Sequence, residues 1–163
     1  MTIFTASMDR STKLITGFIT VLLVVVTLAQ LISSFEHFSY LSIFSSSILP
    51  VFYFLTLIFR PIHYKLSGDR LIIHRLADKV SIDRNQIKEV KQIDPEQLRG
   101  SIRTFGVGGL FGYYGRYANN KLGRMTWYAT RKNKTVLIIT NANEKIILTP
   151  DEPEAFVASL KAS

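Results

Sequence analysis

The sequence predicts a membrane-anchored α+β protein, in which a hairpin of two transmembrane helices over residues 14–59 is followed by a small antiparallel β-domain over residues 60–163. Two apolar runs without a charged residue occupy residues 14–32 and 38–59. From residue 62 onward, apolar residues recur with a period of two, which is typical of strands. The chain ends in a short stretch with helical apolar spacing, so we expect a C-terminal helix to close the sheet.

The N-terminal segment, residues 1–13, begins with an alternating pattern that places Phe4, Ala6 and Met8 on one side. This pattern is typical of a half-buried strand. A frayed terminus is the equal alternative, because chain ends are loose unless something ties them down. If the segment is a strand, its partner must lie in residues 60–163.

The first apolar run has 13 Leu, Ile, Val or Phe among its 19 residues, from Leu14 to Ile32. At 1.5 Å per residue, a helix of this length matches the hydrocarbon core of about 30 Å. The second run, from Phe38 to Phe59, is diluted by serines and contains Pro50. A kink is expected there rather than a break, because proline is tolerated in membrane helices.

The cations predict the orientation of this hairpin. Arg10 and Lys13 precede the first run and Arg60 follows the second, whereas the connector SSFEH, which includes His37, has no Lys or Arg. Cytoplasmic loops of membrane proteins carry an excess of Lys and Arg. We therefore expect a protein of the inner cell membrane with both termini in the cytoplasm. A cleaved signal peptide is disfavoured because a second apolar run follows the first.

The charge of the chain lies almost wholly in residues 60–163, which carry 18 cations and 10 acidic residues. A basic domain beside an anionic leaflet is attracted to it. Nucleic acid is the other common polyanion, but it is disfavoured because no RNA-binding phrase occurs. The absence of cysteine excludes disulfides and Cys-ligated metals.

The β-domain is expected to begin with a hairpin in which strands at 62–66 and 70–75 flank the turn Ser67–Asp69. Further strands are predicted at 79–83 and 87–93. Strands at 125–131, 135–140 and 144–148 are expected to form an antiparallel meander. In the final helix Asp151 and Glu154 are predicted to form a capping pair, so that Pro153 falls in the first turn.

Between these strands, residues 97–143 contain no acidic residue, eight cations and seven of the nine glycines. The phrase from Phe105 to Gly115 predicts a long loop or a distorted hairpin, since glycines permit positive φ and close backbone approach. Its glycine spacing matches no nucleotide-binding fingerprint.

Several phrases resemble the bacterial PH domain family, specifically small membrane proteins that carry such a domain after two spans. They are Ile82, Ile87 and Val90, the block FGVGGLFGYYG at 105–115, TWYATR at 126–131, and the ending ILTPDEPEAFVASL. The resemblance implies a pleckstrin-homology-like β-barrel or sandwich of about seven antiparallel strands with a C-terminal helix, serving as a binding or scaffolding module. Phosphoinositide specificity is not carried over, because the turn SGDR sets Asp69 beside Arg70.

The candidate contacts to anionic lipid or to a protein partner come from the basic, glycine-rich stretch at residues 97–143. They are Arg103, Arg116, Lys121, Arg124, Phe105, Phe111, Tyr113 and Tyr114. A merely solvated basic surface is the alternative for the cations. No cofactor, metal ligand or catalytic residue is predicted. The rival function is a membrane-bound enzyme, or a phosphoryl-ligand-binding protein, that holds a phosphorylated substrate or ligand in the glycine-rich loop at 105–115.

Overall fold

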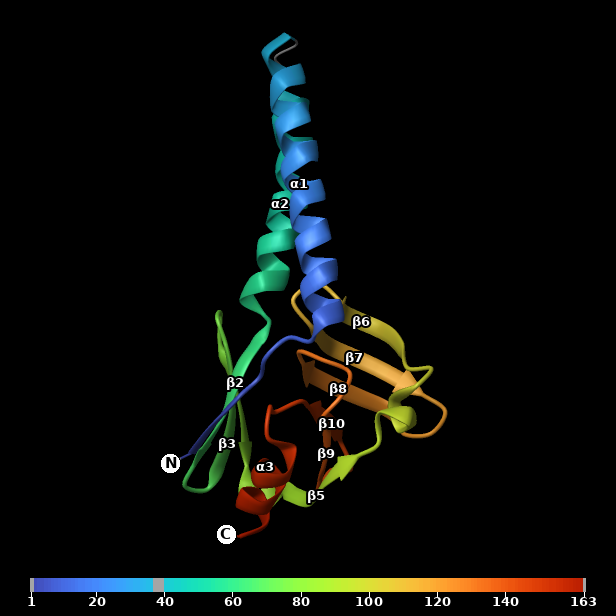
Figure 1. The fold of residues 1–163 in the computed structure, drawn as a ribbon. Coiled ribbons are helices and arrows are strands. Elements are labelled where there is room, and N and C mark those ends of the chain that lie inside the picture. Colours follow the sequence, from blue (N-terminus) through green and yellow to red (C-terminus); the bar gives the residue numbers. More distant parts are fainter. Residues whose placement is uncertain (1, 37–39, 163) are drawn as a thin grey trace.

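The computed structural model describes residues 2–36 and 40–162, with the side chains of 34–36, 40–43 and 46 left out. Two helices, α1 (Arg10–Glu36) and α2 (Tyr40–Ile58), lie side by side as a stalk above a β-domain (Figure 1). Helix α2 continues through Pro50 without a break. The predicted connector between them lies partly outside the described residues, His37 included.

The first sheet has the order β1-β2-β3-β4 and is antiparallel throughout. Its strands are β1 (Thr2–Thr5), β2 (Pro61–Ser67), β3 (Arg70–Arg75) and β4 (Lys79–Asp83). The predicted hairpin around the turn Ser67–Asp69 is therefore present. Of the two alternatives for the N-terminus, the structure has the strand, with Phe4 opposite Tyr64 in the adjoining strand.

The second sheet has six strands in the order β5-β9-β10-β8-β7-β6. They are β5 (Ile87–Ile93), β6 (Ile102–Gly108), β7 (Tyr113–Asn119), β8 (Gly123–Ala129), β9 (Thr135–Thr140) and β10 (Lys145–Leu148). Two 3-10 turns, η1 (Arg84–Gln86) and η2 (Pro95–Leu98), flank β5, and α3 (Pro153–Lys161) ends the chain. The described strands thus exceed the seven expected.

The predicted meander of the last three strands is wrong. Strand β10 inserts between β8 and β9 and pairs parallel with β8, so β8 and β9 are not neighbours. Composition explains this arrangement: β10 (KIIL) and β9 (TVLIIT) are apolar on both faces, which suits central strands covered on two sides. In β10, Ile146 and Leu148 enter one buried cluster and Ile147 enters another on the opposite face.

The main core lies between the two sheets and is closed by α3. Its buried residues are Phe4, Ala6, Tyr64, Leu66, Leu71, Ile73, Ile82, Val90, Val136, Ile138, Ile146, Leu148, Phe156 and Leu160. The apolar stripe predicted for the C-terminal helix therefore packs as expected, with Phe156 edge-on against Phe4 at 5.2 Å between ring centroids. Burial of several such aromatic and aliphatic side chains at about 25 cal/mol per Å² supplies the main drive for joining the sheets.

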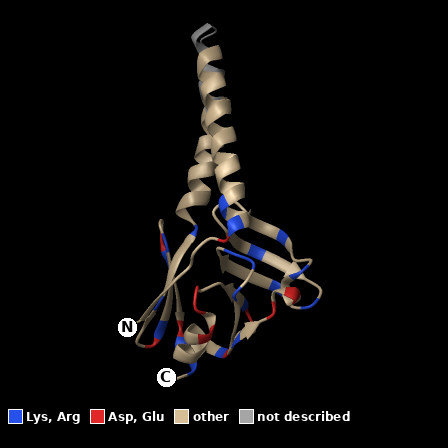
Figure 2. Ribbon diagram, in the orientation of Figure 1, with Lys and Arg blue, Asp and Glu red and all other residues tan. Residues whose placement is uncertain are grey.

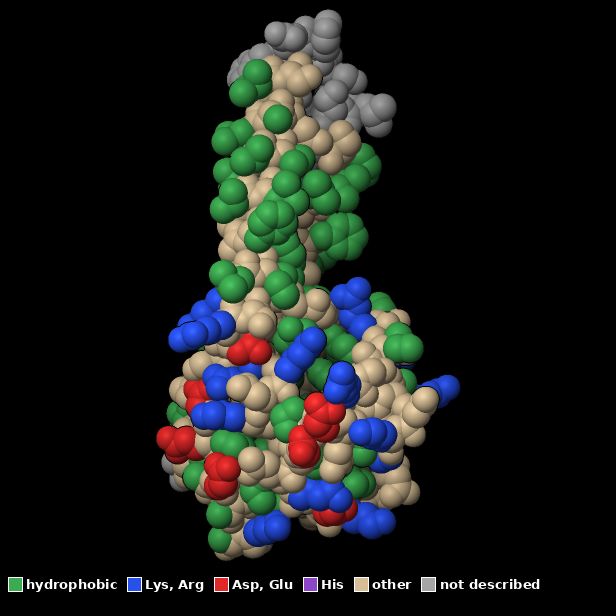
Figure 3. Space-filling view, turned by 45° about the vertical axis from the view of Figure 1, so that its right-hand side comes forward, with side chains coloured by type: hydrophobic (Ala, Val, Ile, Leu, Met, Phe, Trp, Pro, Cys, Tyr) green, Lys and Arg blue, Asp and Glu red, His purple; other side chains and the backbone are tan. Residues whose placement is uncertain are grey.

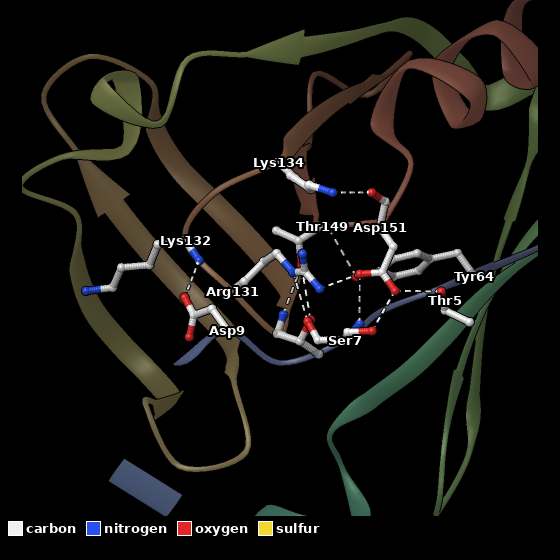
Figure 4. A network of polar contacts seen from close by, with 10 residues as sticks. Thr5, Ser7, Asp9, Tyr64, Arg131, Lys132, Lys134, Thr149 and Asp151 are labelled. Carbon is white, nitrogen blue, oxygen red and sulfur yellow. Dashed lines mark hydrogen bonds and ion pairs between the residues drawn. The ribbon is translucent and has the colours of Figure 1, made fainter. Parts of the chain in front are cut away.

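The predicted capping pair at α3 is not formed. Glu152 is the N-cap residue and Pro153 is the first helical residue, with no side-chain hydrogen bond at the cap. The Asp151 carboxylate instead accepts hydrogen bonds from the Thr5 and Ser7 hydroxyls, each at 2.6 Å, and pairs with Arg131 (Figure 4). Asp151 thus binds residues distant in the sequence instead of capping α3.

This network ties the N-terminal segment to the far end of the chain. The Arg131 guanidinium also donates to the backbone oxygen of Ser7 at 2.8 Å, and the Asp151 amide donates to the backbone oxygen of Thr5 at 2.9 Å. Burial alone raises the pKa of Asp151, but hydrogen bonds from Ser7 and Thr5 and the charge of Arg131 outweigh it and hold the pKa below its usual value.

Asp151→Ala is expected to lower the free energy of unfolding by about 2–4 kcal/mol, because it leaves the half-buried Arg131 without its anionic partner. Because the folded-state pKa is lowered, the stabilisation by Asp151 is present above about pH 4 and is lost as the pH falls below that value. Denaturant titration at several pH values measures both effects. Asp83→Ala, which breaks the exposed pair of Asp83 with Arg70, is the control and should cost less than about 1 kcal/mol.

Candidate functional site at the base of the helical stalk

The β-domain satisfies the last carbonyl groups of α2. The Tyr114 hydroxyl donates to the backbone oxygen of Thr56, and the Ala77 amide donates to that of Ile58 at 2.9 Å. The last carbonyls of a helix have no partner within it, so these bonds fasten α2 to two separate parts of the domain. Burial raises the pKa of Tyr114 above its ordinary value, so the hydroxyl remains a donor even in alkaline solution.

The first turn of α1 is fastened in a similar way. Asp9 precedes the helix, and its carboxylate accepts a hydrogen bond from the Thr12 amide at 2.8 Å and a longer one from the Lys132 amide at 3.4 Å. Burial alone raises the pKa of Asp9, but these two amides and the charge of Arg131 lower it further than burial raises it. A carboxylate at this position is also favoured by the helix dipole.

The glycine-rich turn between β6 and β7 packs against both helices. The Phe111 amide donates to the Thr16 hydroxyl of α1 at 2.9 Å, in a buried position. The Phe111 ring meets Tyr53 of α2 with 5.1 Å between centroids. Gly112 is required here, because its φ is +145° and a Cβ atom would lie 2.6 Å from the backbone oxygen of Ala129. The turn between β6 and β7 therefore packs against the lower ends of both α1 and α2.

Of the two alternatives predicted for the phrase at 105–115, the structure has the distorted hairpin. Gly106 and Gly115 face each other across β6 and β7, and a Cβ atom on either would lie 2.3 Å from a backbone oxygen of the other strand. The register shifts between Arg103 and Phe105, so Thr104 forms a bulge. A bulge changes the direction of the side chains next to it, and this one places Arg103 and Phe105 on opposite faces of the hairpin.

The two faces of this hairpin differ in what they carry. Tyr114 and Arg116 are two residues apart and share one face, and the partners opposite Arg116 and Ala118 are Phe105 and Ile102. Because Tyr114 reaches α2, this face looks toward the helices. Tyr113 and Tyr117 lie on the other face, where Arg103 is opposite Tyr117.

The predicted contact residues are thus divided. Phe105 is 75% exposed and lies with Arg116 on the face toward the helices, as does Arg124, which pairs with Ala118. Lys121 lies in the turn after β7 and donates to the backbone oxygen of Glu96 at 3.0 Å. Arg103 lies on the opposite face.

Three predicted lipid or partner contacts are buried within the protein: Phe111, Tyr113 and Tyr114 are exposed by only 6%, 6% and 5%. Phe111 and Tyr114 join the domain to the helices, and Tyr113 packs beside Trp127. An aromatic, glycine-rich phrase has the same composition whether it meets lipid or protein, so the sequence did not distinguish these cases. Sequence reasoning also did not single out Ile102, which is 72% exposed on the face toward the helices.

Helix α1 has the properties of a membrane span. Residues Arg10–Ser33 have a mean hydropathy of 2.5 in their most apolar window, and 6% of that window is buried in the protein. Among the described residues it is the one helix that is long and apolar enough to cross a bilayer; the apolar part of α2, Ser47–Ile58, is shorter. Hydrophobic side chains cover the visible face of the stalk, and Lys and Arg gather where it meets the β-domain (Figure 3).

The sequence model of a protein family, described as the bacterial PH domain, matches residues 62–163. The chain belongs to the bacterial PH domain family. No curated protein and no solved structure matches it. The match covers β2 to α3, so strand β1, which completes the first sheet, comes from outside the matched residues.

PH domains are generally binding modules, so membership of this family suggests a binding or scaffolding module. Within residues 2–36 and 40–162 no group of three His, Cys, Asp or Glu is arranged to hold a metal ion. This PH domain supplies hydrogen bonds to both helix bases and so forms a junction with α1 and α2.

Thr16→Val is expected to weaken this junction, since it leaves the buried Phe111 amide without an acceptor at a cost of about 1–3 kcal/mol. Amide hydrogen exchange at Phe111 and its neighbours should become faster, while exchange in β3 stays unchanged. Thr104→Val removes an exposed hydrogen bond to the backbone oxygen of Arg116 and is the matched control. Equal exchange at Phe111 in both variants would contradict the junction described here.

Proposed function

We propose that this protein is an integral membrane protein whose two helices cross the bilayer as a hairpin and hold a PH-type binding module against the cytoplasmic leaflet. The proposal rests above all on the pairing of β1 with β2. Strand β1 precedes α1 and β2 follows α2, so both ends of the hairpin lie on one side. If α1 crosses a bilayer, the chain must cross back before β2, and α2 is the segment available to do so.

The exposed apolar surface of the stalk supports the return crossing. The described part of α2 includes large hydrophobic side chains that are 41–67% exposed. They are Phe44, Ile48, Leu49, Val51, Phe52, Phe54 and Leu55. In water, exposure of this many adjacent apolar side chains would be strongly unfavourable, whereas lipid tails solvate them.

The cations support a cytoplasmic location of the domain. Lys and Arg lie at the end of the stalk that adjoins the β-domain (Figure 2), and they include Arg10, Lys13 and Arg60. Lys and Arg next to spans favour the cytoplasmic side. The domain would then lie at the inner leaflet whatever its ligand, because α2 and β2 are separated by only two residues, Phe59 and Arg60.

The face of the β6–β7 hairpin that looks toward the helices is the proposed lipid contact. Phe105 and Ile102 would enter the headgroup region, where amphipathic and apolar side chains are favoured, and Arg116 with Arg124 would contact anionic headgroups. Each such cation contributes about 1 kcal/mol near an anionic surface. Since the helices already recruit the domain, these contacts would orient it and leave its other surfaces free for a protein partner.

The enzyme alternative has less support. The loop at 105–115 would have to offer its amides to a phosphorylated substrate, but the Phe111 amide is bonded to Thr16 and the Gly109 amide to the backbone oxygen of Gly112 at 2.8 Å. The glycines in this loop instead allow close packing against β8 and α1. We therefore favour a binding module over a catalyst.

A protease test addresses the topology. Protease added to intact cells should leave the β-domain uncut, and protease added to inverted inner-membrane vesicles should digest it. The protein should also stay in the membrane after an alkaline carbonate wash, because both helices are surrounded by lipid. Digestion of the β-domain from outside, or release by carbonate, would refute the two-span proposal.

A second test addresses the lipid-facing surface. The chain has no cysteine, so Phe105→Cys accepts a single fluorescent label. In vesicles with brominated anionic lipid we expect strong quenching of this label, because residue 105 would lie at headgroup depth. Lys88→Cys, on exposed β5 at the end of the domain away from the stalk (Figure 1), is the control and should be quenched little. Equal quenching at both positions would contradict the proposed orientation.

A further inference from the structure

A cleft of about 570 Å³ lies on the face of the six-stranded sheet that turns away from the main core. Its floor is aromatic: Tyr117 and Trp127 are stacked with 4.3 Å between centroids, and Tyr113 lies edge-on to Trp127. The segment around η2 forms one wall, from Pro95 to Ser101. A cleft of this size is in the range that holds small organic ligands.

Two cations converge at one end of the cleft. Lys132 lies over the Tyr113 ring, with its Nζ 5.0 Å from the centroid. Arg103 is next to Gly108, since an added Cβ atom on Gly108 would lie 3.5 Å from the Arg103 Nη1. Gly108 and Tyr113 are directly opposite each other in the β6–β7 pair, so both cations adjoin the same pair of residues.

The balance of polar groups in the cleft favours an anion. Arg99 adds a third cation to its lining, and the single carboxylate among the lining residues, Glu96, is already paired with Arg99 at 3.4 Å. In the floor, the indole nitrogen of Trp127 is a buried donor without a hydrogen-bond partner. Cations and donors are thus in excess over acceptors.

Lys132 is held in place from outside the cleft. Its amide donates to Asp9 before α1, and its side chain points away from the polar network around Asp151 (Figure 4). The neighbouring Arg131 is fixed by Asp151 and Ser7. The backbone of Lys132 is therefore anchored beside the cleft, and its side chain reaches over the Tyr113 ring.

We propose that this cleft binds a small organic phosphomonoester, with the phosphate held between Arg103 and Lys132 and the organic part lying over Tyr117 and Trp127. Arginine matches the geometry of phosphate oxygens, and lysine contributes a point charge. The aromatic floor offers an apolar surface for the rest of the ligand. The site is distinct from the lipid-facing side of the hairpin, so it does not depend on how that side meets the membrane.

Trp127 is the only tryptophan in the chain, so its fluorescence reports directly on the cleft. The full-length protein is placed in nanodiscs of neutral lipid and titrated with glycerol 3-phosphate, and separately placed in nanodiscs that contain phosphatidic acid. A saturable fluorescence change with glycerol 3-phosphate indicates a soluble ligand, and a change only with phosphatidic acid indicates the same phosphomonoester on a lipid. No change in either arm would overturn the proposal.

Single-residue variants distinguish a specific phosphate site from a general effect of positive charge. Arg103→Gln and Lys132→Gln are each expected to weaken binding about tenfold or more, since each removes a charged hydrogen bond to phosphate. Lys88→Gln makes the same charge change as Lys132→Gln on β5, outside the lining of the cleft, and should alter affinity less than about twofold. Thermal unfolding confirms that each variant is folded. If Lys88→Gln weakened binding as much as Lys132→Gln, the phosphate site would be refuted.

Discussion

The pairing of β1 with β2 is the constraint on which the rest of the structure depends. It joins the residues before the first helix to those after the second, so the stalk leaves the domain and returns to it at one place. The Asp151 network strengthens this pairing, because its carboxylate binds Thr5, Ser7 and Arg131 together. A helix pair joined to the domain through a single linker could change its orientation freely. Here the chain is paired into the sheet both before α1 and after α2.

The junction extends this constraint to the glycine-rich hairpin. Thr16 on α1 and Thr56 on α2 bind Phe111 and Tyr114, so the turn between β6 and β7 is held by both helices. Groups at helix ends lack partners within their own helix, and the domain provides them. Because the hairpin is bonded to both helix bases, each of its faces keeps a defined direction relative to the two helices.

The alternation of side chains along β6 and β7 divides these sides. Phe105 and Arg116 look toward the helices, whereas Arg103 and Tyr117 look into the aromatic cleft. The bulge at Thr104 sets this division, because without it Phe105 and Arg103 would share a face. The same anchor bears on the cleft, as Asp9 holds the backbone of Lys132 at the base of α1. The attachment of the domain to α1 and the proposed phosphate site thus share Asp9 as a structural support.

Local patterns in the sequence determined most of the elements: the alternation at 62–93 located β2 to β5, the apolar runs located both helices, and Pro153 located the start of α3. These features are set by neighbouring residues, through dihedral preferences and side-chain period. Tertiary structure alone decided that β10 lies between β8 and β9, that Asp151 binds the N-terminal segment instead of capping α3, and that Phe111, Tyr113 and Tyr114 are buried. Each of these outcomes depends on partners far along the chain, and a carboxylate or an aromatic ring has the same local signature whichever distant partner it finds.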